Sequence, residues 1–348
     1  MSDPLPELRR RIERALDPLI PAGATCALVD YPNYGNVGDS AIWLGEIAYL
    51  RSRGCRIVHA CSDGTYDRRT LLDAVGNGTI LLNGGGNFGD LWPDHQELRE
   101  RLVEDFPGNR VIQLPQSIHF DSPRALEQAQ QVFRTHADFH ILVRDPRSEY
   151  LARQTFSNPV HLCPDMALML DLGRLSPSAD AANILVLSRT DKEKAVRFGV
   201  DALPSEDLIA ADWIEEPTPA DRWLFDWANR RLTWRSKVPR RVLHRLTVVA
   251  ATRMARQRLA RGIGLLRQGR VLVTDRLHAL ILGWLGGMPV YFVDNSYGKL
   301  AGFRQCWLEL EPSITQARSF SEAIAGAREA LERKMQSPGN GYGHAARS

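Results

Sequence analysis

The 348-residue sequence lacks the features that mark exported, membrane-spanning and metal-binding proteins. Its five cysteines are an odd number without the paired spacing of a zinc site, so we expect reduced thiols in a reducing compartment. The longest apolar stretches, such as 279–288, fall far short of the roughly 20 residues that cross a bilayer. The segment 4–19 mixes charged and apolar residues, unlike an export signal. These absences predict a cytoplasmic protein.

Several catalytic signatures are missing as well. No glycine-rich loop is followed by the Lys-Ser or Lys-Thr pair of a P-loop, and no Gly-x-Ser-x-Gly elbow indicates an α/β-hydrolase. His136 and His140 have the i, i+4 spacing of helical metal ligands, but His140 begins an apolar run typical of a strand, and no third ligand stands nearby. We therefore predict no metal site.

Short apolar runs alternate with helical patterns along most of the chain, and each run ends in turn or polar residues. The predicted strands cover residues 25–29, 56–60, 79–82, 110–114, 139–143, 183–187, 270–274 and 289–293. Helical patterns such as 40–51 and 123–135 lie between them, as in successive βαβ units. The sequence thus predicts an α/β protein with mostly parallel sheets.

The chain is longer than a single hydrophobic core usually supports, which favours two domains. A stretch rich in Pro, Ser and Asp at 172–182 interrupts the pattern and is the best candidate for a linker. We expect Rossmann-like domains at 1–172 and 183–318, followed by a C-terminal helix and mobile tail at 319–348. The two domains are expected to face a central cleft.

Two loops that follow predicted strands combine glycine with several polar side chains. Glycine permits sharp turns and lets the backbone approach a ligand closely. The residues that could contact a ligand are Asn33, Asn36 and Asp39 in the first loop and Asn83, Gly85 and Asn87 in the second. A purely structural role is open for each loop, namely a capped helix start for the first and a tightly packed turn for the second.

Cationic side chains follow other predicted strands. Arg144 and Arg276 come directly after apolar runs or one residue later, and Lys299 follows the last predicted strand. Open α/β sheets bind ligands at the carboxyl ends of their strands, so Arg276, His278 and Lys299 could converge on one anion. Ordinary alternatives remain, because Arg144 could simply pair with Asp145 and a lone histidine is more often structural.

Together these motifs resemble the polysaccharide pyruvyl transferase family. The matching segments are 33–39 (NYGNVGD), 83–87 (NGGGN), 113–117 (QLPQS), 143–145 (VRD), 163–165 (CPD), 275–278 (DRLH) and 298–299 (GK). They run in family order from about residue 25 to 305, and the region 189–270 matches least. The joint match is far more specific than any single motif.

The resemblance implies a GT-B-like fold and an enzyme that transfers the enolpyruvyl unit of phosphoenolpyruvate to a sugar, usually closing a cyclic ketal. It implies a phosphoenolpyruvate site built from Arg144, Arg276, His278 and Lys299. The loops 33–39 and 83–87 would face the acceptor, which in this family is usually a lipid-linked saccharide. Phosphoenolpyruvate is the donor co-substrate, and no other cofactor is expected.

The chemistry of phosphoenolpyruvate suits these residues, because guanidinium groups can bind its carboxylate and phosphate bidentately. We hypothesise that Arg144 and Arg276 hold these groups, that Lys299 stabilises the leaving phosphate, and that His278 is the general acid or base. The main alternative is a GT-B-type nucleotide-sugar glycosyltransferase, in which Arg276 and Lys299 would neutralise a diphosphate. A non-catalytic sugar- or phosphate-binding protein is a third reading.

Positive charge is concentrated in one segment. Residues 230–270 contain 13 Arg or Lys and no Asp or Glu, although the net charge of the chain is only +3. The part 240–256 would form a basic amphipathic helix, a composition that binds anionic membranes, here the inner face of the cell membrane. A solvated helix face explains the pattern equally well. Nucleic acid is not expected, because Trp234 is the only Trp, Tyr or Phe among the charges.

Overall fold

The computed structural model describes residues 3–189, 207–213, 220–234, 237–294 and 298–336, and these form two compact units. Unit 1 comprises 1–173, 213–264 and 301–311, whereas unit 2 comprises 174–212, 265–300 and 312–348. The first boundary falls in the predicted linker. The second domain expected at 183–318 is not continuous, however, because 213–264 and 301–311 pack with unit 1. Residues 337–348 of the expected tail lie outside the described residues.

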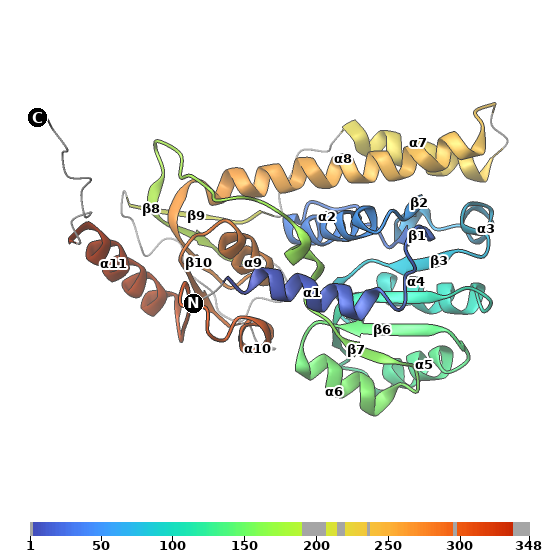
Figure 1. Ribbon diagram of the computed structural model, residues 1–348, viewed down its shortest axis with the longest axis horizontal. Helices are drawn as coiled ribbons and strands as arrows, with labels where there is room; N and C mark the ends of the chain where they lie inside the picture. The colour runs from blue at the N-terminus through green and yellow to red at the C-terminus, as the bar shows by residue number, and fades with distance from the viewer. Residues whose placement is uncertain (1–2, 190–206, 214–219, 235–236, 295–297, 337–348) are drawn as a thin grey trace, which may run out of the picture. The chain divides into compact units, whose positions relative to one another are not determined.

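Unit 1 is built on a seven-stranded parallel sheet with the order β2-β1-β3-β5-β6-β7, and β4 pairs with the far half of β5 (Figure 1). Its strands are β1 (Thr25–Val29), β2 (Arg56–Cys61), β3 (Thr79–Leu82), β4 (Gly85–Gly89), β5 (Val111–His119), β6 (Phe139–Val143) and β7 (Val160–Leu162). All the runs predicted in this region are strands. The sequence predicted neither β4, because glycine is depleted in strands, nor the three-residue β7.

Helices and two 3-10 turns connect and cover these strands. They are α1 (Leu5–Leu16), α2 (Val37–Ser52), η1 (Asp63–Thr65), α3 (Arg68–Val75), α4 (Pro93–Asp105), α5 (Pro123–Phe133), α6 (Pro146–Thr155), η2 (Met166–Met169), α7 (Ala220–Thr233) and α8 (Arg240–Leu266). The strands β1 and β3 are buried along nearly their whole length, which is typical of a parallel sheet covered on both faces. Helix α10 (Lys299–Trp307) begins in unit 2 and continues into unit 1.

Unit 2 contains a five-stranded parallel sheet with the order β12-β11-β10-β8-β9. Its strands are β8 (Ala182–Leu187), β9 (Leu208–Ala211), β10 (Gly269–Thr274), β11 (Val290–Val293) and β12 (Ile314–Ala317), and its helices are α9 (Leu277–Leu285) and α11 (Phe320–Gln336). The predicted fold class, α/β with mostly parallel Rossmann-like sheets, is confirmed. The short strands β9 and β12 were not predicted.

Each sheet has one point where the chain changes the side on which it adds strands. In unit 1, β2 and β3 flank β1, and in unit 2, β9 and β10 flank β8. Loops that leave such a point diverge and open a crevice at the carboxyl edge, where open α/β sheets bind ligands. We call the edge between β1 and β3 the first switch point and the edge between β8 and β10 the second switch point.

The hydropathy of the helices bears on membrane association. In the described part of the chain, no helix is long and apolar enough to cross a membrane.

Candidate functional site

Asp30 follows β1 at the first switch point and has an unusual backbone conformation. Its φ is +67°, a value that no other non-glycine residue in the described ranges approaches, because all of them have negative φ. A left-handed conformation costs a non-glycine residue of order 1 kcal/mol and tends to persist at functional sites. The side chain is 1% exposed, so its carboxylate needs hydrogen-bond donors from the protein.

His95 of α4 and Asn87 of β4 supply those partners. Oδ1 of Asp30 lies 2.6 Å from Nδ1 of His95, and Nδ2 of Asn87 donates to Oδ2 at 3.0 Å. Burial alone lowers the pKa of His95, but the hydrogen bond and negative charge of Asp30 outweigh it and raise the pKa above its ordinary value. An aspartate on Nδ1 also fixes the ring of a histidine that transfers protons. The ring of Tyr34, 39% exposed, lies edge-on at 6.1 Å.

A network of amides and one buried arginine holds Asn87. Its Oδ1 accepts hydrogen bonds from Nε2 of Gln116 at 2.7 Å and from Nη2 of Arg99 at 2.9 Å. Nε of Arg99 donates to Oε1 of Gln113 at 2.6 Å. Burial lowers the pKa of Arg99 to about 10, so it remains charged at neutral pH. The two glutamines of segment 113–117 therefore fix the position of the second glycine loop.

The two glycine loops, 33–39 and 83–87, lie next to each other. Asn36 caps α2 by accepting from the N–H of Gly38 at 2.9 Å, and its Nδ2 donates to Asp39 at 2.8 Å. Gly85 has a φ of +136°, and a Cβ at that position would lie 3.6 Å from Oδ1 of Asp39. The structure thus brings the candidates of loops 33–39 and 83–87 to one edge.

Three buried acceptor atoms at or beside these loops accept no hydrogen bond within the described residues. They are Oδ1 of Asn33, Oδ1 of Asn83 and Oε2 of Glu46. Oε1 of Glu46 accepts from the N–H of Gly84 at 2.7 Å, and burial raises the pKa of Glu46 well above its ordinary value. Burial thus favours the protonated form of Glu46, which can donate a hydrogen bond as well as accept one. Unsatisfied buried groups cost about 1–3 kcal/mol each, so these atoms favour a ligand that carries hydroxyl groups.

Two arginines of α8 hold the backbone of the first glycine loop. Nη1 of Arg258 donates to the carbonyl of Pro32 at 2.7 Å, and Nη2 of Arg261 donates to the carbonyl of Gly35 at 2.5 Å. Arg258 is 1% exposed. Both residues belong to the basic segment 230–270, so part of this segment faces inward, in addition to the outward-facing roles predicted from the sequence.

Arg144 follows β6 on the same sheet edge and is almost completely buried. Its Nη1 donates to Oδ2 of Asp165 at 2.5 Å, and its backbone N–H donates to the carbonyl of Gln116 at 3.1 Å. Asp165 is 0% exposed. The pairing with Asp145 that we had considered is not the arrangement found, since Asp145 caps α6 by accepting from the N–H of Ser148 at 2.8 Å. Segment 163–165 thus supplies the counter-charge of Arg144.

The second switch point contains a second buried arginine. Arg276 occupies the position before α9 and is 4% exposed, and its Nη2 lies 2.7 Å from the carboxylate of Asp212, which follows β9. Asp275 accepts from the backbone N–H of Arg189 at 2.8 Å, which ties the loop after β8 to the loop after β10. Burial raises the pKa of Asp275, and the donors and charges of Arg189 and Arg276 offset only part of that effect.

His278 and Lys299 lie along the same edge of unit 2. His278 is half-buried in the first turn of α9, directly after β10. Lys299 begins α10, which follows β11, the parallel neighbour of β10. The structure therefore places Arg276, His278 and Lys299 at the carboxyl ends of two adjacent strands. Residues 295–297 of the intervening loop lie outside the described residues.

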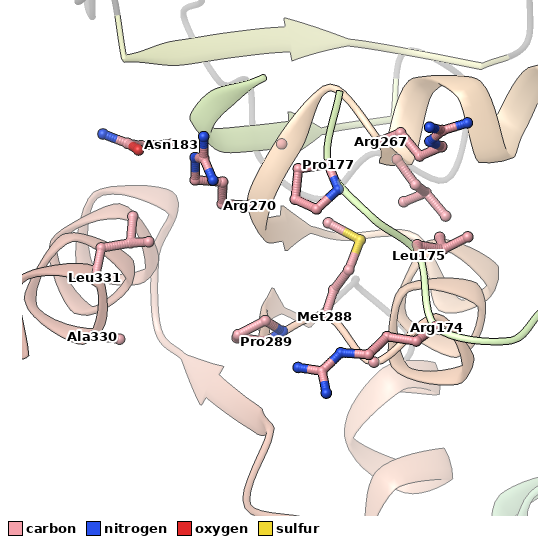
Figure 2. A pocket seen from close by; sticks show the side chains of 13 residues that line it. Arg174, Leu175, Pro177, Asn183, Arg267, Arg270, Met288, Pro289, Ala330 and Leu331 are labelled. Atoms are coloured by element: carbon pink, nitrogen blue, oxygen red, sulfur yellow. The ribbon is translucent and has the colours of Figure 1, made fainter. Parts of the chain in front are cut away.

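A cavity of about 650 Å³ opens in unit 2, at the amino ends of β8, β10 and β11 (Figure 2). Arg174, Arg267 and Arg270 surround an apolar floor that includes Met288 and Pro289, and no carboxylate lines it. None of the predicted site residues contributes to this cavity. It is therefore separate from the second switch point, at the opposite edge of the same sheet.

Sequence reasoning missed the Asp30–His95 pair and the buried Arg99. Asp30 could have been selected because it is a charged residue that directly follows a predicted strand, which is also the position that selected Arg144. His95 and Arg99 lie in the polar first half of α4 and carry no signal of their own. Among the described residues, no three His, Cys, Asp or Glu side chains gather as a potential metal site.

Comparisons with known proteins agree with the motifs. Residues 36–297 match the family model "Polysaccharide pyruvyl transferase". The chain is 30% identical over 295 residues to Pyruvyl transferase 1 of Schizosaccharomyces pombe, which covers 81% of this chain and 69% of that protein. It is 30% identical over 309 residues to EpsO of Bacillus subtilis, covering 88% and 92%. A crystal structure of a functionally uncharacterized Klebsiella pneumoniae protein aligns with a TM-score of 0.55 at 18% identity, covering 92% and 100%, and supports the fold alone.

Proposed function

Because the chain belongs to the polysaccharide pyruvyl transferase family, we propose that it transfers the enolpyruvyl unit of phosphoenolpyruvate to a sugar of a polysaccharide or glycolipid precursor. The reaction would release phosphate and close a pyruvate ketal across two hydroxyl groups. The observation that carries the proposal is the family match over residues 36–297. The lipid carrier of the acceptor and the cytoplasmic location stay predictions.

The two buried arginines are the proposed anion-binding groups. Arg144 is oriented by Asp165 and Arg276 by Asp212, each through a guanidinium–carboxylate hydrogen bond of 2.5–2.7 Å. A guanidinium held in this way loses little conformational entropy when it binds the carboxylate or phosphate of the donor. Lys299, at the start of α10, would stabilise the leaving phosphate.

Proton transfer completes the chemistry. The methylene carbon of phosphoenolpyruvate must gain a proton, which leaves the adjacent carbon open to attack by one sugar hydroxyl. Phosphate then departs, and the second hydroxyl adds to the same carbon. We assign the first proton to His278, since an imidazole can both donate and accept a proton.

The Asp30–His95 pair is a second proton-transfer group in this proposal. Nδ1 of His95 is engaged by Asp30, which leaves the other ring nitrogen to accept a proton from a hydroxyl. The glycine loops beside this pair contain the buried, unsatisfied acceptors of Asn33 and Asn83. Hydroxyl groups of a sugar match this set of acceptors, which supports the first switch point as the acceptor side.

The decisive experiment is a direct assay. The protein is incubated with phosphoenolpyruvate and a panel of acceptor sugars, and phosphate release is measured together with the mass of the acceptor. We expect phosphate release that depends on the acceptor and a mass gain of one pyruvyl ketal. Calorimetry with uridine diphosphate sugars addresses the alternative. Tight binding of such a sugar, with no binding of phosphoenolpyruvate, would indicate a nucleotide-sugar glycosyltransferase.

His278→Ala tests the proposed proton donor. We expect turnover to fall by about 10²–10⁴-fold, the usual contribution of a positioned acid or base, while phosphoenolpyruvate affinity changes only a few-fold. His140→Ala is the matched control, because His140 lies near the amino end of β6, at the opposite edge of a sheet. Turnover retained in His278→Ala would remove this residue from the mechanism.

Arg276→Lys tests the anion clamp. A lysine keeps the charge but cannot reproduce the two parallel donors of a guanidinium, so we expect the KM for phosphoenolpyruvate to rise by about tenfold. Arg270→Lys, at the amino end of the same strand β10, is the control and should leave the KM unchanged. Equal KM values for Arg276→Lys and the native protein would contradict the assignment.

A further inference from the structure

The helices α7 and α8 form an antiparallel hairpin within unit 1 (Figure 1). Gln257 of α8 donates to Asp221 at the start of α7 at 3.0 Å, and Arg240 at the start of α8 donates to the carbonyl of Leu232 at 2.8 Å. One side of each helix is buried, through residues such as Phe225 of α7. The opposite sides form an outer face.

Two tryptophans lie on α7, and a third directly follows it. Trp223 and Trp227 are four residues apart and therefore share one side of α7, and Trp234 follows the last residue of the helix, Thr233. Trp223 is 70% exposed and Trp234 is 77% exposed. The rings of Trp223 and Trp227 stack at 6.1 Å with an interplanar angle of 19°. Tryptophan is usually well buried in soluble proteins, so this cluster indicates contact with another apolar phase.

The outer side of α8 is basic. Its exposed arginines Arg241, Arg245 and Arg256 form no ion pair within the described residues, whereas Arg240 and Arg253 are paired with Asp73 and Asp221. Val242 and Val249 are exposed between them, at 42% and 40%. Arg230 and Arg231 add exposed charge on α7 beside the tryptophans.

We propose that this outer face of α7 and α8 docks on an anionic phospholipid membrane. Tryptophan rings favour the headgroup level of a bilayer, where one part of the indole is apolar and the N–H is hydrated. Arginines within a Debye length of anionic headgroups add electrostatic attraction, and stable peripheral binding usually needs two such signals together. The exposed valines between the arginines suit contact with the apolar part of a membrane. They would contribute nothing to binding the phosphate backbone of a nucleic acid.

Two other occupants fit the face less well. A second copy of the chain that used the same patch in a symmetric contact would place arginines against arginines. A single-stranded nucleic acid could stack on the tryptophans, but such sites combine aromatics with a charged groove, and here the charge lies on convex helix surfaces. These occupants are therefore outcomes of the test rather than proposals.

Docking at this face would also orient the first switch point. The opposite side of α8 carries Arg258 and Arg261, whose hydrogen bonds hold the carbonyls of Pro32 and Gly35. The same helix thus joins the proposed membrane contact to the loop beside Asp30. The proposal does not depend on phosphoenolpyruvate being the donor.

The test is co-sedimentation of the full chain with vesicles, either of phosphatidylcholine alone or of equal parts phosphatidylcholine and phosphatidylglycerol. Two variants are compared with the native protein: Trp223→Ala with Trp227→Ala and Trp234→Ala, and Arg230→Glu with Arg245→Glu and Arg256→Glu. The matched control combines Arg124→Glu and Arg134→Glu on α5 with Tyr150→Ala on α6, where Tyr150 is 71% exposed. Thermal denaturation establishes that each variant is folded.

We expect the native protein and the control to bind only the anionic vesicles. Each arginine near such a surface contributes about fivefold in affinity, so the charge-reversed variant should bind at least roughly 100-fold more weakly. The tryptophan variant should lose most of its binding. Vesicle binding that does not depend on the anionic lipid, or that the tryptophan substitutions leave unchanged, would overturn the proposal. So would self-association through the face, or vesicle binding that the control loses equally.

Discussion

The two switch points use an aspartate at a strand end in different ways. At the first, Asp30 adopts a left-handed backbone and accepts from two side chains, His95 and Asn87. At the second, Asp275 accepts from the backbone of Arg189 and leaves Arg276 to pair with Asp212. The first edge is therefore rich in amides and an imidazole, which suit hydroxyl groups. The second edge presents cationic groups, which suit an anion.

This difference shows how one topology can serve two kinds of ligand. Both edges arise where a parallel sheet reverses the side on which it adds strands, so the backbone creates the same crevice twice. Only the side chains at the strand ends differ. The chemistry of each site is thus set by a few residues that the common fold positions, not by the fold itself.

The largest expected effect comes from the buried ion pairs that orient the two arginines. Asp165→Asn removes the buried carboxylate to which Arg144 donates, so we expect the free energy of unfolding to fall by about 3–5 kcal/mol. Asp212 is 12% exposed, whereas Asp165 is 0% exposed, so water can partly replace the lost carboxylate in unit 2. Asp212→Asn should therefore cost less, about 1.5–3 kcal/mol. Urea denaturation measures both.

The comparison would fail if Asp212→Asn destabilised the protein more than Asp165→Asn. Asp138→Asn provides a control for an exposed pair, because the ion pair between Asp138 and Arg110 is 42% and 35% exposed and should contribute little, about 0–1 kcal/mol.

The smallest expected effect concerns protonation at the first switch point. Asp30→Asn removes the charge that raises the pKa of His95 and leaves the effect of burial, so the pKa should fall below its ordinary value of 6.5. Titration of the imidazole signal by NMR measures this change, with His140 as the unaffected reference. If neutral His95 accepts the hydroxyl proton, the acidic limb of the kcat/KM profile should move to lower pH. A pKa that stays raised would contradict the Asp30–His95 assignment.

The same pair has a defined influence on stability. Protonated His95 is the form that Asp30 favours, so its contribution to stability is complete below pH 6.5 and declines as the pH rises through the raised pKa of the folded state. In Asp30→Asn the folded-state pKa should lie below 6.5, so the sign should reverse and stability should increase as the pH rises from that lowered pKa to 6.5.

The sequence was sufficient for most of the sheet architecture. Runs such as 79–82 and 139–143 are largely apolar and buried and are bounded by polar turns, and each run predicted from this pattern forms a strand. The glycine-rich β4 and the short β9 have no such pattern. The return of 213–264 to unit 1 could not be predicted either, because it depends on tertiary contacts such as that of Arg258 with Pro32.

The candidate site was only partly predictable. The position of Arg144 and Arg276 at the carboxyl edge could be predicted, because both residues follow apolar runs. The positions of their partners Asp165 and Asp212 were not predictable, because both residues follow short strands, β7 and β9, that the sequence did not predict. The role of His95 could not be predicted either, because it depends on a contact with Asp30, which lies 65 residues away in the chain.

The contacts of Arg258 and Arg261 with the first glycine loop have a consequence for how this site can evolve. Both arginines bind main-chain carbonyls, of Pro32 and Gly35, and every amino acid offers a carbonyl. The loop can therefore keep its path while its side chains change. Variation in acceptor preference among related chains can be sought in the side chains of residues 33–36, with α8 retained as the fixed frame that presents them.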